Sequence, residues 1–119
     1  MATPPQGGVL AVTFTVVTPL QDDALIADGA GTVLVQVNNL DTQNTRFRAT
    51  ITDISSSTVV GTQDLAQEGN TSRWSNRVGV GKVPSSVPKT NNKTVTIQAF
   101  LGTVTGDSDS NDFKASSSG

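Results

Sequence analysis

Apolar and polar residues alternate along several short stretches of the chain, so that every second position is hydrophobic. This period of two is typical of a β-strand that buries one face and exposes the other. The clearest stretches are TVLVQV at 32–37, RFRATITD at 46–53 and TVTIQAFL at 94–101. Their predicted inward-facing residues are Val33, Val35 and Val37; Phe47, Ala49 and Ile51; and Val95, Ile97, Ala99 and Leu101.

Shorter patterns and turn residues fill the rest of the chain. Further short strands are expected around Ala24–Ala27, at 58–65 and at 72–80. The strand at 46–53 is expected to pair with its predecessor at 32–37. The polar piece at 81–93 contains Pro84 and Pro88, which cannot donate main-chain hydrogen bonds, and it is predicted to be a loop or a crossover between sheets.

The first apolar stretch, VLAVTFTVV at residues 9–17, is hydrophobic on both faces. One face carries Leu10, Val12, Phe14 and Val16, and the other carries Val9, Ala11 and Val17 beside two threonines. An ordinary edge strand alternates more cleanly. This strand is therefore expected to be covered on both sides, either at the centre of its own sandwich or by pairing with a second chain. Val9, Leu10, Val12, Phe14 and Val16 are the predicted assembly residues.

Strands at a spacing of about ten residues, without a predicted helix, indicate an all-β, two-sheet antiparallel sandwich of Ig-like or jelly-roll type with about seven or eight strands. The predicted domain covers residues 9–114. A flexible leader at 1–8, MATPPQGG, precedes it, and a frayed tail at 115–119 follows it. Fifteen valines and seventeen threonines support strands over helices, because β-branched side chains suit a pleated surface.

The order of VLVQVNNLDTQNTRFRATITD, a variable hairpin, SRWSNRVGV and then TVTIQAFLG resembles the Ig-like and fibronectin-like adhesion domains of bacterial surface and fibre-forming proteins. The resemblance covers roughly residues 31–102 and rests on the spacing of strands. It implies a β-sandwich and a role at a surface.

Composition removes most catalytic chemistry. The chain has no cysteine, histidine or tyrosine, so thiolate metal sites, disulfides and histidine-based catalysis are absent. We expect no enzyme activity and no cofactor. Neither a signal-peptide pattern nor a long apolar run is visible, so membrane insertion is not expected.

Charge is distributed unevenly along the sequence. Residues 1–45 carry four aspartates and no cation, whereas residues 69–106 carry five cations and no acid. This polarity is either scattered surface charge or a pair of opposite faces that attract when copies stack.

The stretch GDSDSND at 106–112 is the one candidate metal site, with Asp107, Asp109, Asn111 and Asp112 as ligands. A calcium loop of the EF-hand kind would place a glycine at its sixth position and a glutamate at its twelfth. Here these positions hold Asp112 and Ser118. We therefore interpret the stretch as a polar turn that ends strand pairing and keeps an edge charged.

Two further candidates were weighed. Trp74 shares its predicted face with Val78 and Val80, so core packing is favoured over a sugar-stacking platform. Arg46 and Arg48 lie on a predicted outward face, but no aromatic residues interleave with them along the sequence, so nucleic-acid binding is not expected.

These observations favour a non-catalytic structural subunit that assembles with copies of itself. The predicted assembly is a surface fibre or appendage, a spore coat or a capsid layer, in which the N-terminal segment docks on a neighbour. The arrangement resembles pilus-type fibres, in which each subunit completes the next subunit's sheet. The alternatives are a monomeric adhesion or carbohydrate-binding module and a phage decoration or tail protein.

Overall fold

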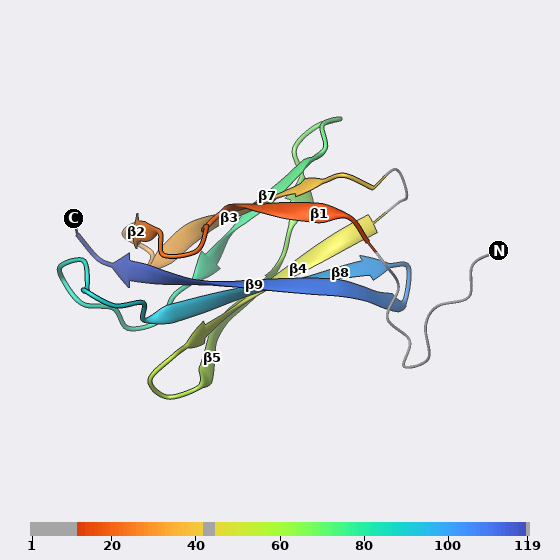
Figure 1. Ribbon diagram of the computed structural model, residues 1–119. Helices are drawn as coiled ribbons and strands as arrows, with labels where there is room; N and C mark the ends of the chain where they lie inside the picture. Colours follow the sequence, from red (N-terminus) through yellow and green to blue (C-terminus); the bar gives the residue numbers. More distant parts are fainter. Residues whose placement is uncertain (1–11, 42–44, 119) are drawn as a thin grey trace.

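A computed structural model describes residues 12–41 and 45–118, which form two β-sheets packed face to face (Figure 1). The four-stranded sheet has the order β1 (Phe14–Thr18), β3 (Thr32–Asn39), β7 (Arg73–Gly79), β6 (Ala66–Gln67). The five-stranded sheet has the order β2 (Ala24–Ile26), β9 (Val104–Ser116), β8 (Lys93–Leu101), β4 (Thr45–Asp53), β5 (Thr58–Asp64). The predicted all-β sandwich is confirmed. Residues 12–41 and 45–118 contain no helix long and apolar enough to cross a membrane.

The core lies between the sheets and follows the alternation of the sequence. Val33, Val35 and Val37 of β3 are fully buried, as are Phe47, Ala49 and Ile51 of β4. On β8 the alternation buries Val95, Ile97 and Ala99. The inward faces of these three strands are therefore as predicted, except that Leu101 at the end of β8 is only partly buried and lies outside the core. Burial of this apolar surface is the main favourable term that holds the sheets together, since no disulfide is available.

Strand pairing differs from the prediction at β4. This strand pairs with β5 on one side and β8 on the other, whereas β3 pairs with β1 and β7 in the opposite sheet. The expected β3–β4 hairpin is therefore wrong. Period-two alternation shows which face of a strand is buried, but strands of both sheets bury the same kind of face, so it does not choose the partner.

The last strand also differs from the prediction. Residues 106–112 lie within β9, and 108–112 pair in register with β8, with Ile97 opposite Asp109 and Thr96 opposite Ser110, while the register shifts at 106–107. The turn between these strands lies at Gly102–Thr103 instead. The expected frayed tail is corrected too, because Ala115 and Ser116 are fully buried in β9. Pairing with β8 overrides the weak strand propensity of aspartate, serine and asparagine.

Residues 80–92 connect β7 in one sheet to β8 in the other, which confirms the predicted crossover. Strand pairing also brings together the N-terminal and C-terminal parts of the described chain. The short strand β2 pairs in parallel with the end of β9, and Leu25 lies opposite Ala115. All other strand pairs are antiparallel.

One long side of the sandwich closes where β5 meets β7 across the gap between the sheets. A Cβ atom placed on Gly61 of β5 would overlap the carbonyl oxygen of Gly79 of β7. A Cβ placed on Gly81, just after β7, would lie 2.9 Å from the Cβ of Val60. The main chains of the two sheets therefore approach more closely here than side chains would permit.

We predict that Gly61→Ala destabilises the domain, because its methyl group would push the backbone of β7 away. Overpacking of this kind costs about 1–3 kcal/mol. Gly29→Ala is the matched control, since the space around Gly29 is open and its backbone conformation suits alanine. The control should be neutral or slightly stabilising, by about 0.5 kcal/mol. Urea unfolding of both variants measures the difference, and equal stabilities would contradict the close approach of β5 and β7.

Candidate functional site

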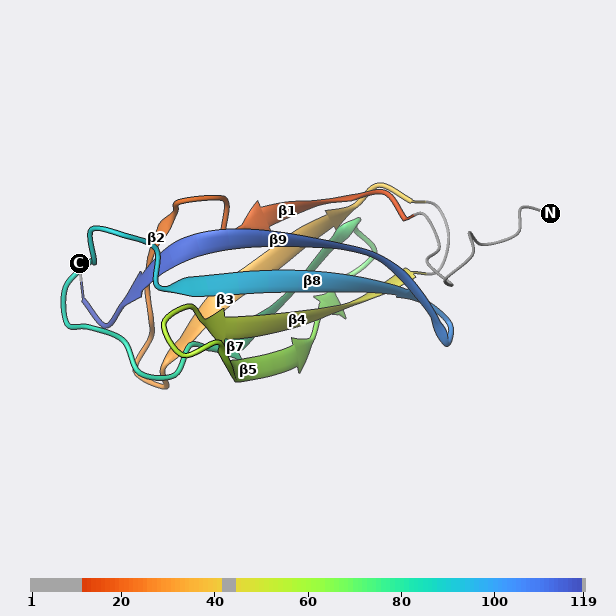
Figure 2. The ribbon, with the colours of Figure 1, turned by 60° about the horizontal axis from the view of Figure 1, so that its bottom comes forward.

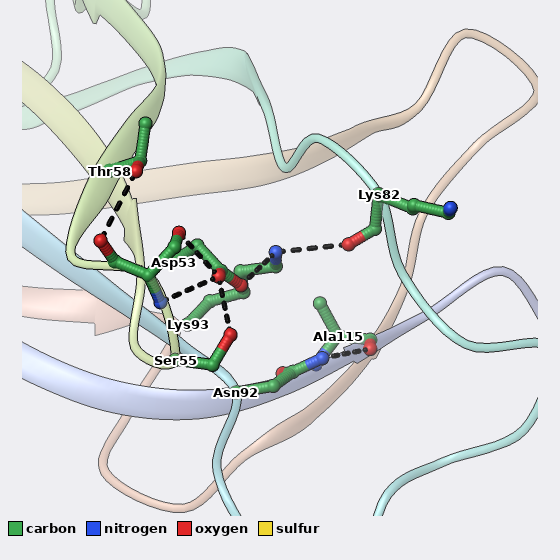
Figure 3. A network of polar contacts seen from close by, with 8 residues as sticks. Asp53, Ser55, Thr58, Lys82, Asn92, Lys93 and Ala115 are labelled. Atoms are coloured by element: carbon green, nitrogen blue, oxygen red, sulfur yellow. Dashed lines mark hydrogen bonds and ion pairs between the residues drawn. The ribbon is translucent and has the colours of Figure 1, made fainter.

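A polar network fills one end of the sandwich around the buried amine of Lys93 (Figure 3). The Lys93 Nζ donates to Asp53 Oδ1 at 2.7 Å and to the carbonyl oxygen of Lys82 at 3.0 Å. The other carboxylate oxygen, Asp53 Oδ2, accepts the hydroxyls of Ser55 and Ser56, each at 2.8 Å. These bonds hold the pKa of the Asp53 carboxyl well below its usual range, with the Lys93 bond as the largest cause.

This network lines an open recess of about 550 Å³. The carboxylate of Asp53 and the amide of Asn92, however, already form hydrogen bonds within the chain. Both oxygens of Asp53 accept bonds from its own chain. The side-chain amide of the neighbouring Asn92 bonds to the main chain of Ala115. Its Nδ2 donates to the Ala115 carbonyl at 2.9 Å, and its Oδ1 accepts the Ala115 N–H at 2.8 Å. The network joins the end of β4, the β7–β8 crossover and β9. Its chemistry is structural, because its carboxylate, amide and amine are all bonded to groups of the chain itself.

A second recess, of about 420 Å³, lies beside the predicted outward arginines of β4. Arg48 forms an ion pair with Asp64 at 2.8 Å and lies over the ring of Phe100, 5.1 Å from its centroid. Arg46 reaches the carbonyl oxygen of Gly102 at 3.4 Å. Sequence reasoning missed this aromatic neighbour, because Phe100 comes from β8 and only the β4–β8 register places it there. Of the two arginines, Arg48 is already paired with Asp64 and is therefore less available to bind a phosphate.

Trp74 lies in an aromatic cluster at the edge of the core. Its ring meets Phe47 edge-on, with centroids 5.8 Å apart, and Phe47 in turn meets Phe14 at 5.3 Å. The tryptophan is partly buried and packs against the core. The predicted packing of Trp74 against the core is thus seen. A sugar-stacking platform would instead expose one face of the ring to solvent.

The candidate metal ligands alternate along a strand. The cross-strand partners Val95 and Ile97 face the core, so Asn111 and Asp109 point to the inward side of β9, as does Asp107. Asp112 points to the opposite face, where it accepts the Thr94 hydroxyl at 2.7 Å. Residues 12–41 and 45–118 hold no group of three or more acidic side chains placed to bind a metal ion.

Asp107 and Asn111 instead connect the two sheets along their other long side. The Val12 N–H donates to Asp107 Oδ2 at 3.2 Å, and the Asn111 side chain donates to the Pro19 carbonyl at 3.1 Å. These bonds bridge the residues just before and just after β1 to the N-terminal and central parts of β9. Both views show β1 running beside β9 (Figure 2). We call this gap, with Asp109 between its two bridges, the β1–β9 seam.

The predicted assembly residues occupy β1 and its approach. Val12 and Val16 are buried in the chain's own core, and Phe14 packs against it. Val9 and Leu10 lie outside the described residues. Within residues 12–41 and 45–118, β1 is an edge strand paired only with β3.

Within the part of the chain that the structure describes, some main-chain groups of β1 point away from β3 at this edge. The N–H of Leu40 donates to Thr13, but the N–H of Asn39 donates to Ser72, away from β1. Phe14 lies opposite Asn39, and Val16 lies two residues further on the same strand. Facing residues of an antiparallel pair alternate between pairs whose main-chain groups bond to each other and pairs whose groups point away from each other. Since the N–H of Asn39 points away from β1, the N–H and C=O groups of Phe14 also point out of the sheet, and so do those of Val16.

The exposed edge of β9 is protected, in contrast to β1. The Ser110 N–H is bound by the side chain of Asp109 at 2.9 Å. The Asp112 N–H is bound by the side chain of Gln21 at 3.1 Å, and the Asp112 carbonyl accepts the N–H of Asp22 at 2.8 Å. Charged and bonded side chains of this kind block strand addition.

The remaining edges are short or covered. The edge strands β6 and β2 are two and three residues long. On β5, Asn76 donates to the Asp64 carbonyl at 3.0 Å, and β7 lies against Gly61. Among the described edge strands, β1 has outward N–H and C=O groups at Phe14 and Val16 that no such side chain binds, although Asp107 binds the N–H of Val12 just before the strand.

The uneven charge of the sequence is partly cancelled by folding. Asp28, from the acidic first third of the chain, forms an ion pair with Arg77 of the basic segment at 2.8 Å. Lys93 of the same basic segment is paired with Asp53. The acidic and basic blocks of the sequence therefore meet at the Asp28–Arg77 pair.

The fold is similar to that in the crystal structure of CopC from Methylosinus trichosporium OB3b, with a TM-score of 0.58. The sequences are 12% identical, and the match covers 87% of this chain and 94% of that one. No protein-family model matches the sequence, and no curated protein matches it. At this identity the likeness shows a shared β-sandwich and carries no function with it.

The Lys93–Asp53 pair should make stability depend on pH. The native pKa of Asp53 is lowered, so its contribution is fully present above the unfolded value of about 3.9 and is lost as the pH falls below it. We predict that Asp53→Asn lowers the melting temperature at pH 7. The difference from the wild type should shrink between about pH 4 and pH 2.

Asp64→Asn is the control for this measurement, because its partner Arg48 is half-exposed and surface pairs contribute about 0–1 kcal/mol. Thermal melts of the three proteins across this pH range test the prediction. A melting temperature of Asp53→Asn equal to that of the wild type at pH 7 would contradict it.

We also predict that calcium does not raise the melting temperature appreciably. On a strand, the side chains of Asp107 and Asp109 start about 7 Å apart, and the first already accepts the Val12 N–H. Melts with millimolar calcium and with a chelator check this. A rise of several degrees that the chelator reverses would establish a metal site in the seam.

Proposed function

We propose that this protein is a non-catalytic structural subunit that assembles with copies of itself into a surface fibre, appendage or shell. The contact is made at the edge of β1, and the N-terminal segment of one subunit docks on its neighbour. The observation that carries the proposal is the difference between the edges. The edges at β2 and β6 are short, Asn76 binds the Asp64 carbonyl of β5, and the side chains of Asp109 and Gln21 protect β9, whereas Phe14 and Val16 present open main-chain groups.

Strand addition at this edge would use both main-chain hydrogen bonds and side-chain burial. The segment that leads into β1 is apolar at Val9, Leu10 and Ala11. The side chains of Val12, Phe14 and Val16 anchor β1 to its own core, so the edge is held in a fixed position. A fixed edge loses little entropy when a partner strand binds.

The absence of a catalytic constellation also supports a structural role. The sequence has no histidine or cysteine, and the most perturbed carboxyl, Asp53, is saturated by bonds from its own chain. The resemblance of strand spacing to bacterial surface and fibre-forming domains supports a location on a cell, spore or virion surface.

The alternative is a monomeric adhesion or carbohydrate-binding module. The recess beside Asp53 supports it, because exposed hydroxyl side chains and the exposed lysine Lys82 line it. Trp74 weighs against it, because its ring packs on Phe47. A phage decoration or tail protein would use the same edge for a different partner. Size in solution distinguishes a module from a subunit, since a module stays monomeric as concentration rises.

We predict that Thr15→Lys weakens self-association. Thr15 is exposed at the centre of β1, and lysine on an edge strand opposes strand addition. Thr62→Lys is the matched control, since Thr62 is an exposed threonine of the edge strand β5. Analytical ultracentrifugation should show about a tenfold or larger rise in dissociation constant for Thr15→Lys alone, which corresponds to about 1.4 kcal/mol. Equal effects of the two changes would place the contact elsewhere.

Removal of residues 1–8 should likewise weaken assembly and leave the fold intact, because these residues precede the core strands. Size-exclusion chromatography reports the assembly, and circular dichroism reports the fold. If the full-length protein is as monomeric as the truncated one at high concentration, the structural-subunit proposal fails and the adhesion module replaces it.

A further inference from the structure

Carboxylates border the open edge of β1 on the side of the seam. Asp107 binds the N–H of Val12 at the start of the strand, and Asp109 lies between the two bridges on the same inward side of β9. Asp22 and Asp23 follow the end of β1, where the N–H of Asp22 donates to the Asp112 carbonyl. Within residues 12–41 and 45–118 none of these four carboxylates is in an ion pair.

The four carboxylates affect what can bind at the edge. If two β1 edges paired antiparallel about a two-fold axis, the start of each strand would lie beside the end of the other. Asp107 and Asp109 of one copy would then approach Asp22 and Asp23 of the second copy. Like charges brought together at an interface oppose association strongly. A closed pair of β1 edges is therefore disfavoured by charges that the fold places on both sides of it.

The N-terminal segment carries no such conflict. Residues 1–11 contain no aspartate, glutamate, lysine or arginine, and Val9, Leu10 and Ala11 are apolar. Eight extended residues span roughly 26 Å, which is enough to reach a neighbouring copy. An uncharged strand can pair with the main chain of Phe14 and Val16 without bringing further negative charge to the seam.

We propose that the carboxylates of the seam select the partner of the β1 edge. They permit the uncharged N-terminal segment of a neighbouring copy and reject the β1 edge of a second copy. Each subunit then donates one segment and accepts another, so association is head-to-tail and open-ended. Asp107 and Asp109 are the specificity-determining residues. This inference rests on the proposed function, because it names the partner of the same edge.

The experiment uses a truncation that lacks residues 1–8 and therefore removes most of the donor segment. In this background Asp107→Asn and Asp109→Asn are combined. Asparagine keeps a side-chain oxygen that can accept the N–H groups of Val12 and Ser110, so the substitutions remove charge and retain the hydrogen bonds. The control combines Asp64→Asn and Glu68→Gln, which remove two charges near the opposite edge, at β5 and β6.

Analytical ultracentrifugation should show that the truncated protein is monomeric and that the Asp107→Asn/Asp109→Asn form is dimeric, with a dissociation constant lower by about tenfold or more. The control should remain monomeric. In 1 M salt, where the Debye length is about 3 Å, the unsubstituted truncation should also dimerise. This salt measurement does not depend on whether the substituted protein folds.

Two outcomes would overturn the inference. The first is a truncated protein that already dimerises at low salt with its carboxylates intact. The second is a truncated protein that stays monomeric both after charge removal and in 1 M salt. Failure of the proposed function gives a different result, since the full-length protein itself would then be monomeric at every concentration.

Discussion

The main-chain groups of an edge strand must find partners or be protected, and this constraint shapes the whole sandwich. Each edge strand turns half of its N–H and C=O groups away from its sheet. Here β2 and β6 limit the exposure by being short, and on β5 the Asn76 side chain binds the carbonyl of Asp64. On β9 the side chains of Asp109 and Gln21 bind the outward N–H groups. On β1, Asp107 binds the N–H of Val12 just before the strand, whereas no such device binds the outward groups of Phe14 and Val16, and this is why the edge defines the proposed function.

The two long sides of the sandwich close by different means. On one side, Gly61 and Gly79 let the main chains of opposite sheets touch. On the other, side chains bridge a wider gap, with Asp107 reaching Val12 and Asn111 reaching Pro19. The first side is closed by main-chain contact, whereas the second is bridged by polar side chains. The network at Lys93 fixes one end, because a buried amine requires a partner and finds it in Asp53. Without a disulfide, these contacts supplement the apolar core in holding the sheets in register.

The sequence predicts the faces of strands much better than their partners. The alternation in β3, β4 and β8 identified nearly all of their buried residues, because burial of one face is a local pattern. The β3–β4 pairing was predicted wrongly, since both strands show the same pattern but belong to different sheets. Residues 106–112 were predicted as a turn because Asp, Ser and Asn favour turns. Their strand conformation, and the bond from Asp107 to a residue near the other end of the chain, depend on contacts that no local window contains.

The parallel pairing of β2 with the end of β9 has a consequence for biosynthesis. A chain grows from its N-terminus, so β2 is made well before β9, the strand with which it pairs. The seam likewise needs β9 before β1 can be bridged to the five-stranded sheet. Contacts this distant in sequence make folding slow, because a long loop must close before they form. A chain that ends before β9 therefore cannot complete the seam, and it lacks Asp107 and Asp109 beside the β1 edge.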